Sequence, residues 1–234
     1  MPRLSIDDFK LFSVTCELRY NSAFLIYDRT GHIVEDLRPH FNDIAMSTAG
    51  PVQSAFVSEK GTFNLEIGAS RFTSNASLQK NGEIFARHCQ VFFDSVTTRL
   101  GIEVFTRVGL RYVARKEFGT LDEAAAALAS CNLANLKPTK RFNSSGSPTE
   151  VLFRWEDKEI GAFIRLRAES GEVKFTPSPE MRDYLPSVDK RINVLTLDMD
   201  YYTVAAVRRE QWNCTEWLQT KIRMIKKEAD AILG

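Results

Sequence analysis

Residues 104–116 read Val-Phe-Thr-Arg-Val-Gly-Leu-Arg-Tyr-Val-Ala-Arg-Lys, and the polarity of these side chains alternates with a period of two. Apolar residues occupy one set of alternate positions: Val104, Val108, Leu110, Tyr112 and Ala114. The opposite set contains Arg107, Gly109, Arg111, Val113 and Arg115. Successive side chains of a β-strand point to opposite faces of a sheet. The stretch therefore predicts a strand over residues 102–116 that packs through one face and presents a row of arginines on the other.

Strand patterns recur along the chain, at residues 11–20, 53–58, 62–69, 150–155, 161–168 and 193–207. In the first of these, one face is expected to pack through Phe12, Val14, Cys16, Leu18 and Tyr20. Residues 53–58 and 62–69 predict one hairpin, and residues 150–155 and 161–168 predict another. Residues 23–27 are expected to pair with the first strand before a turn at residues 28–31, with a short helix at residues 33–37.

Helical spacing replaces the alternation in three places. From about Glu83, apolar residues recur at Phe85, Cys89, Phe92, Val96 and Leu100, and Gly101 follows where a C-terminal cap is expected. Thr120 and Glu123 form a capping box, which predicts that a helix begins there. Asn213 and Glu216 repeat this signal before an amphipathic helix with an apolar face of Leu218, Ile222, Ile225, Ala229 and Ile232.

These elements predict an α+β protein. We expect mainly antiparallel sheets in two related halves, packed by a central helix and by the amphipathic C-terminal helix. The halves are residues 1–136 and residues 150–234, and residues 137–149 form a linker or long loop rich in Pro, Ser and Gly. A single domain is the alternative. Three prolines predict an irregular segment after the second hairpin: Pro177, Pro179 and Pro186.

Composition narrows the function classes. The 234 residues are 44% hydrophobic, and 31 basic residues against 30 acidic ones give a net charge of +1. Any binding of nucleic acid must therefore come from local clusters of charge rather than from the whole chain. The chain has no signal-peptide layout and no apolar stretch of about 18 residues, so we expect a cytoplasmic protein without membrane contact. The four cysteines form no CxxC pair and are expected in the core.

Two segments carry a family resemblance. The strand Arg107-Val-Gly-Leu-Arg-Tyr-Val113 and the unit Leu195-Thr-Leu-Asp-Met-Asp-Tyr-Tyr202, which a helix follows, resemble a sporadically distributed bacterial family of uncharacterised function. In that family an R-[IV]-G-L-R-Y-[IV] strand lies in the middle of the chain and an L-D-[IM]-D strand precedes the last helix. The resemblance implies a shared fold and a bacterial or phage-related setting, such as an accessory or defence-type system.

The arginines are the candidate binding residues. Residues two apart share a face of a strand, so the row from Arg107 through Arg111 to Arg115 extends for about 26 Å. Arg165 and Arg167 add a second pair. Guanidinium groups bind phosphate through parallel hydrogen bonds, which favours nucleic acid or a nucleotide as the partner. The structural alternative is that carboxylates on neighbouring strands pair with the arginines; these are Glu17, Glu66, Asp198 and Asp200.

An enzymatic alternative uses the same acidic residues. Asp198 and Asp200, with Glu66, would hold a divalent metal for a phosphohydrolase or nuclease. No catalytic motif surrounds any of the three histidines, and no phosphate-binding glycine loop is present. The sequence therefore favours a non-catalytic binding or interaction module without a cofactor, with a protein partner or a second copy of itself, and with nucleic acid as a candidate ligand.

Overall fold

A computed structural model of the chain describes residues 4–23, 25–50, 52–77, 82–131, 140–141, 144–145, 149–175 and 187–234. Within these residues the strands form a ten-stranded antiparallel sheet and a separate two-stranded sheet. Most of the expected linker at residues 137–149 lies outside the described residues, as do Pro177, Pro179 and Pro186. No helix in the described part of the chain is long and apolar enough to cross a membrane.

The described residues form twelve strands and four α-helices. The strands are β1 (Lys10–Tyr20), β2 (Ala45–Ala49), β3 (Gln53–Ser58), β4 (Phe63–Gly68), β5 (Arg71–Ser77), β6 (Val104–Phe118), β7 (Lys140–Arg141), β8 (Ser144–Ser145), β9 (Glu150–Glu156), β10 (Ile160–Phe175), β11 (Val188–Thr203) and β12 (Val207–Arg208). The α-helices are α1 (Ile26–Leu37), α2 (Gly82–Leu100), α3 (Leu121–Ser130) and α4 (Cys214–Leu233). Short 3-10 helices are η1 (Ile6–Asp8), η2 (Glu59–Gly61) and η4 (Arg209–Gln211).

Strand β6 lies at the centre of the sheet. The order is β2-β3-β4-β5-β1-β6-β11-β10-β9, and β12 also pairs with β6. The α+β class and the antiparallel pairing predicted from the sequence are confirmed. Strands β6 and β11 pair from Gly109–Tyr202 to Phe118–Asn193. The strands of the two expected halves therefore join into one sheet.

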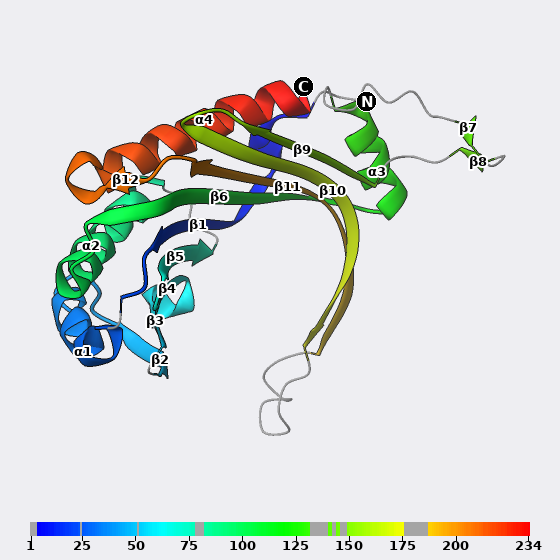
Figure 1. Cartoon of the computed structure of the whole chain (residues 1–234). Coiled ribbons are helices and arrows are strands. Elements are labelled where there is room, and N and C mark those ends of the chain that lie inside the picture. Colours follow the sequence, from blue (N-terminus) through cyan, green and yellow to red (C-terminus); the bar gives the residue numbers. More distant parts are fainter. Residues whose placement is uncertain are drawn as a thin grey trace.

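The helices cover one side of this sheet. Helices α1, α2 and α4 line the outer side of the curved sheet, and its inner side carries no helix in the part of the chain that is described (Figure 1). Phe85 and Phe92 of α2, Leu218 of α4, and Leu110 and Leu197 of the sheet are fully buried in one hydrophobic core. Full burial of one such side chain contributes about 1.5–3 kcal/mol, so the helices are held firmly against the outer side.

Several local predictions are confirmed. Thr120 Oγ1 accepts a hydrogen bond from the Glu123 backbone, and the Glu123 side chain accepts one from the Thr120 backbone, which is the expected capping box of α3. Helix α2 ends at Leu100, and Gly101 has a φ of 65°, a left-handed conformation that glycine adopts without steric strain.

The expected strand at residues 23–27 and the turn at residues 28–31 are wrong. From Ile26 the chain forms helix α1 instead, because Ile26, Thr30, Ile33 and Leu37 recur at helical spacing and are all buried. The expected strand over residues 193–207 is also corrected. It ends at Thr203, and β12 is a separate strand that pairs with Val104 and Phe105 of β6.

Two bulges change which side chains pack. The pairing of β1 with β6 shifts at Phe12 and again at Thr106, and each extra residue reverses the alternation of faces. Phe12 was expected in the core, but it is 44% exposed and its ring lies 3.6 Å from the guanidinium carbon of Arg115. Val104 was also expected to pack, but it is exposed and Phe105 is buried in its place.

Candidate functional site

The inner side of the sheet carries a field of charged residues, which we call the charged face. Its arginines come from the five strands β5, β1, β6, β10 and β9 and are Arg71, Arg19, Arg107, Arg111, Arg115, Arg165, Arg167 and Arg154. Its carboxylates are Glu66, Glu17, Asp198, Asp200, Glu169, Glu150 and Glu156. The strand alternation predicted from the sequence puts these residues on the side opposite the core. All five predicted arginines, and the four predicted carboxylates Glu17, Glu66, Asp198 and Asp200, lie on this face.

Arg111 and Asp198 form a pair with two parallel hydrogen bonds on the charged face. Arg111 Nε donates to Asp198 Oδ1 at 2.8 Å, and Arg111 Nη2 donates to Asp198 Oδ2 at 2.7 Å. The Asp198 side chain is only 8% exposed, whereas that of Arg111 is 56% exposed. The hydrogen bonds to Asp198 raise the pKa of the Arg111 guanidinium. A carboxylate this deeply buried needs such a partner, because an unpaired buried charge is strongly destabilising.

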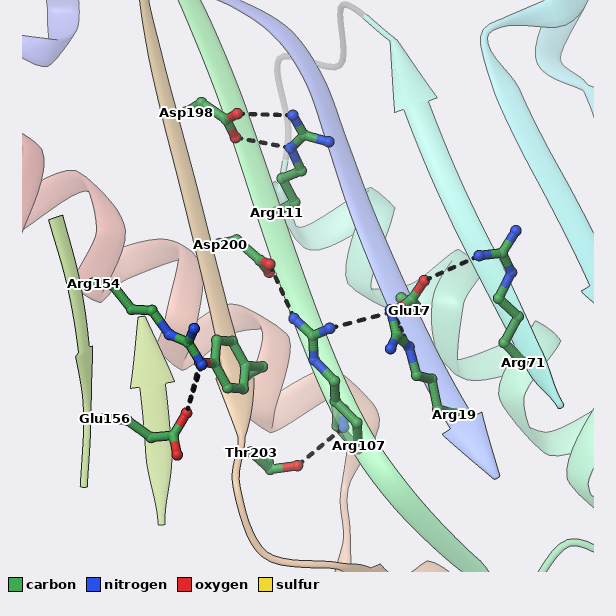
Figure 2. A network of polar contacts seen from close by, with 12 residues as sticks. Glu17, Arg19, Arg71, Arg107, Arg111, Arg154, Glu156, Asp198, Asp200 and Thr203 are labelled. Atoms are coloured by element: carbon green, nitrogen blue, oxygen red, sulfur yellow. Dashed lines mark hydrogen bonds and ion pairs between the residues drawn. The ribbon is translucent and has the colours of Figure 1, made fainter. Parts of the chain in front are cut away.

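Arg107 joins two strands across the middle of the face. Figure 2 shows its guanidinium between Asp200 and Glu17, with Arg107 Nη2 donating to Asp200 Oδ2 at 3.0 Å. Its Nη1 lies 3.9 Å from Glu17 Oε1, and its guanidinium carbon lies 4.3 Å from the centre of the Tyr202 ring. Burial raises the pKa of Asp200 above its usual value, although the nearby cations Arg107 and Arg111 oppose this shift.

Glu17 connects the arginines of three strands. Its carboxylate accepts a hydrogen bond from Arg19 Nε at 2.7 Å and also lies 3.9 Å from Arg71. Arg71 lies in turn 3.5 Å from Glu66 on β4. These contacts, drawn in part in Figure 2, form a network of opposite charges that extends across the sheet from β4 to β11.

The second predicted arginine pair is also matched by carboxylates. Arg165 Nε lies 3.0 Å from Glu150 Oε1, and Arg167 Nη2 lies 2.5 Å from Glu169 Oε2. Glu169 also lies 4.0 Å from Arg115. The structural alternative predicted from the sequence therefore describes much of this face, and its carboxylates include Glu150 and Glu169, which the sequence did not single out.

Hydrogen-bond donors nevertheless exceed acceptors on the charged face. Four of its arginines have a buried Nε atom without a hydrogen-bond partner among the described residues: Arg107, Arg115, Arg165 and Arg167. For Arg165 the approach to Glu150 is a close ion pair, but the N–H direction does not make it a hydrogen bond. On this face nearly every arginine thus lies close to a carboxylate, but several guanidinium N–H groups have no hydrogen-bond acceptor among the described residues.

An open depression of about 630 Å³ lies in the charged face. Its charged lining consists of Arg107, Arg111, Arg154, Arg165, Glu156, Asp198 and Asp200. Four cations against three carboxylates leave a small excess of positive charge around this hollow. Phe163 and Tyr202 add aromatic surface, and the Tyr202 hydroxyl donates to Glu156 at 2.9 Å.

The three carboxylates of the metal hypothesis do not converge. Glu66 is on β4 and Asp198 is on β11, and strands β5, β1 and β6 lie between them. Neighbouring strands are about 4.8 Å apart, so four spacings separate Glu66 from Asp198 along the sheet. Each of the three carboxylates is also paired with an arginine. Across the described ranges, no three His, Cys, Asp or Glu residues are grouped so that they could hold a metal ion.

Other residues that could have served a functional site instead take part in packing. All four cysteines are buried, as predicted. The His88 ring lies 4.8 Å from the Phe41 ring and 5.2 Å from the Phe63 ring, so this histidine packs among aromatic side chains. Lys221 of α4 is buried near the Trp217 ring, and this burial lowers its pKa.

The residues of the depression that were missed from the sequence include Arg154, Glu156 and Tyr202. The alternation in residues 150–156 could have indicated that Arg154 and Glu156 share a face, but it could not have shown which strand lies beside them. Only the pairing of β9 with β10 and of β10 with β11 brings them to the central arginines. No protein-family model matches this chain, and no curated protein matches its sequence significantly.

Proposed function

We propose that this chain is a non-catalytic binding module that holds phosphate groups of a nucleic acid or nucleotide in the depression of the charged face. The observation that carries the proposal is the surplus of guanidinium donors there. Arg107 and Arg165 each have a buried Nε atom without a partner, although both lie close to carboxylates. These Nε atoms are themselves buried, but the side chains of Arg107 and Arg165 are 24% and 33% exposed, so an acceptor from outside would have to bind the other N–H groups of their guanidinium forks.

Phosphate fits this surplus better than a carboxylate does. Each guanidinium carries five N–H donors in a fixed fork, and a phosphate offers several oxygens that accept parallel hydrogen bonds from it. The exposed arginine Arg111 donates to Asp198 through Nε and Nη2. Its third nitrogen, Nη1, has no acceptor among the described residues. Arg154 at the rim is 68% exposed and 3.6 Å from Glu156. These two side chains are the first that an incoming phosphate would meet.

The near balance of charge limits the kind of binding. With seven carboxylates among eight arginines, the charged face has no broad positive field to attract polyanions at long range. Binding then depends on short-range hydrogen bonds at the depression. We therefore expect the ligand to occupy the depression rather than to bind at many places on the charged face. A bacterial accessory or defence-type setting remains part of the proposal, on the strand resemblance at residues 107–113.

Fluorescence anisotropy tests the proposal, with labelled single-stranded RNA, single-stranded DNA and a nucleoside triphosphate as separate probes. The variants are Arg154→Ala and Arg165→Ala, which remove guanidinium groups at the depression without emptying the core. A charge-assisted hydrogen bond contributes about 1.5–3 kcal/mol, so each substitution should weaken binding about tenfold or more. The probe that binds most tightly distinguishes a strand from a free nucleotide.

The matched control is Arg223→Ala on helix α4, whose guanidinium donates hydrogen bonds to Gln219 and Thr220 of the same helix. Circular dichroism and urea unfolding establish that all three variants remain folded. Unchanged affinity in both face variants would contradict the proposal. So would an equal loss in Arg223→Ala, or the absence of binding to every probe by the wild-type protein.

A further inference from the structure

Strand β9 forms an edge of the sheet. It is the last strand in the order, and β10 is its only neighbour among the described strands (Figure 1). Six of its seven residues are exposed, and Val151 is half-buried. Three of the exposed side chains are large and apolar: Leu152, Phe153 and Trp155. An exposed apolar edge strand is a ready template for pairing with another strand.

The hydrogen-bond pattern shows which groups point away from β10. The Ala168 amide donates to the Thr149 carbonyl at 2.8 Å, and the Asp157 amide donates to the Ile160 carbonyl at 3.0 Å. In an antiparallel pair the bonded positions alternate, so the odd-numbered residues of β9 bond to β10. The backbone groups of Glu150, Leu152, Arg154 and Glu156 therefore point outward, and they have no hydrogen-bond partner within the described ranges.

Strand β9 lacks two of the usual protections of an edge, a bulge and a proline. Its pairing with β10 runs without a bulge from Glu150 to Glu156, and it contains no proline. The opposite edge differs, because β2 is shorter and its pairing with β3 shifts between Met46 and Thr48. Bulges and short lengths protect natural edges from adding a strand. The open edge of this sheet is thus β9.

We propose that β9 pairs with β9 of a second copy of this chain, antiparallel and about a two-fold axis at Leu152. In this register Leu152 lies opposite the partner's Leu152, and Glu150 lies opposite the partner's Arg154. Two opposite-charge pairs then form on the charged face, one on each side of the axis. On the other face, Phe153, which is 38% exposed, lies opposite the partner's Val151 and loses contact with water.

Charge selects this register over its neighbours. A two-fold antiparallel pair must place outward residues opposite outward residues, which leaves three registers with at least three outward pairs. A shift of the axis to Phe153 sets Glu150 against the partner's Glu156. A shift to Arg154 sets Arg154 against itself. Like charges directly opposite each other are destabilising, so only the register centred on Leu152 is complementary.

The pairing would join two charged faces into one surface. Arg154 and Glu156 lie on β9 and also line the depression, so the two depressions would lie side by side across the axis. Glu150 would lie between Arg165 of its own chain and Arg154 of the other chain, because the Glu150–Arg165 contact of 3.0 Å uses only one carboxylate oxygen.

Disulfide trapping tests the register. Opposed residues of a bonded antiparallel pair have Cα atoms about 5.5 Å apart, which suits a disulfide. Leu152→Cys should therefore give a covalent dimer on mild oxidation. Arg154→Cys is the matched control, since its copies would lie about 13 Å apart, four residues along the strand. The native cysteines are all buried and do not compete.

Sedimentation equilibrium supplies a second, independent test. The wild-type protein should be a dimer, and Leu152→Pro should make it a monomer while leaving it folded, because the Leu152 amide points away from β10. If Leu152→Pro unfolds the chain, Arg154→Glu replaces it and should also give a monomer. A monomeric wild-type protein would overturn the proposal. Equal cross-linking of Leu152→Cys and Arg154→Cys would overturn the register centred on Leu152. If Leu152→Pro or Arg154→Glu is folded and still dimeric, β9 is not the dimer interface.

Discussion

Arg111 of β6 reaches along its strand to hold Asp198 of β11 with two hydrogen bonds, although the residue directly opposite Arg111 is Asp200. Arg107 likewise bonds to Asp200 rather than to a residue beside it. When the register of β6 and β11 is extended to Arg107, Arg111 leans by two residues and Arg107 by four, so that Asp198 and Asp200 are each matched with a different cation. The pairing satisfies the buried Asp198 and leaves part of Arg111 exposed at the depression.

The first prediction concerns this pair. Arg111→Gln should destabilise the protein by about 1–3 kcal/mol, because it leaves the buried Asp198 carboxylate without its bidentate partner. Asp198→Asn in the same chain should recover most of the loss, since the charge that lacked a partner is then gone. Urea unfolding of the wild type, both single variants and the double variant measures the coupling.

An exposed ion pair is the control for this cycle. Arg208 and Glu210 lie 3.7 Å apart and both side chains are largely exposed. Their coupling should be close to zero, because solvent screens exposed pairs. Equal coupling in the two cycles would contradict the structural role assigned to Arg111 and Asp198.

The second prediction concerns pH and Asp36. Arg99 donates to Asp36 at 2.8 Å and 2.6 Å, Ser95 donates at 2.9 Å, and the Arg99 hydrogen bonds lower the pKa of the Asp36 carboxyl. A lowered pKa stabilises the fold above the ordinary aspartate pKa, and this contribution is lost as the pH falls through the lowered value. Asp36→Asn should therefore be less stable than the wild type at neutral pH, with a difference that shrinks in acid. Urea unfolding at a series of pH values measures it, and a difference independent of pH would contradict the assignment.

The third prediction concerns Asp200, whose pKa shifts the opposite way. Burial raises the pKa of Asp200, so its carboxyl should take up a proton at a higher pH than Asp36 does. The stability that this shift provides is present below the unfolded pKa and is lost as the pH rises through the folded pKa. Carboxyl-carbon NMR titration measures both groups in one experiment. The reverse order of titration would mean that the pairing of Asp200 with Arg107 outweighs its burial.

The centre of the fold was predictable from the sequence because its alternation is regular except at the bulge at Thr106. In β6 and β11, charged and apolar residues alternate over many positions, and the structure confirms both strands and the faces of Arg107, Arg111, Asp198 and Asp200. Strand β5 was missed because Ser74 occupies a buried position on it, so residues 71–77 show no alternation of apolar and polar types.

The partners of the arginines could not be read from the sequence. Pairing depends on strand order and register, and a bulge at one residue, such as Phe12 or Thr106, exchanges the two faces of a strand. Glu17 and Arg71 are neighbours only because β5 pairs with β1. Helix α1 was misread for a related reason. Its four buried residues follow a helical period, but Gly31 and short polar residues between them resemble a turn.

The salt dependence of binding tests the central claim most directly, because it counts phosphate contacts. For a labelled single strand, the logarithm of the affinity should fall with the logarithm of salt concentration by about 0.7 per phosphate neutralised. Binding through the four arginines of the depression predicts a slope of about −3 for the wild type, which Arg154→Ala should reduce by about 0.7. A slope that is the same in the wild type and in Arg154→Ala would contradict the account, because the depression would then not be where phosphate is held.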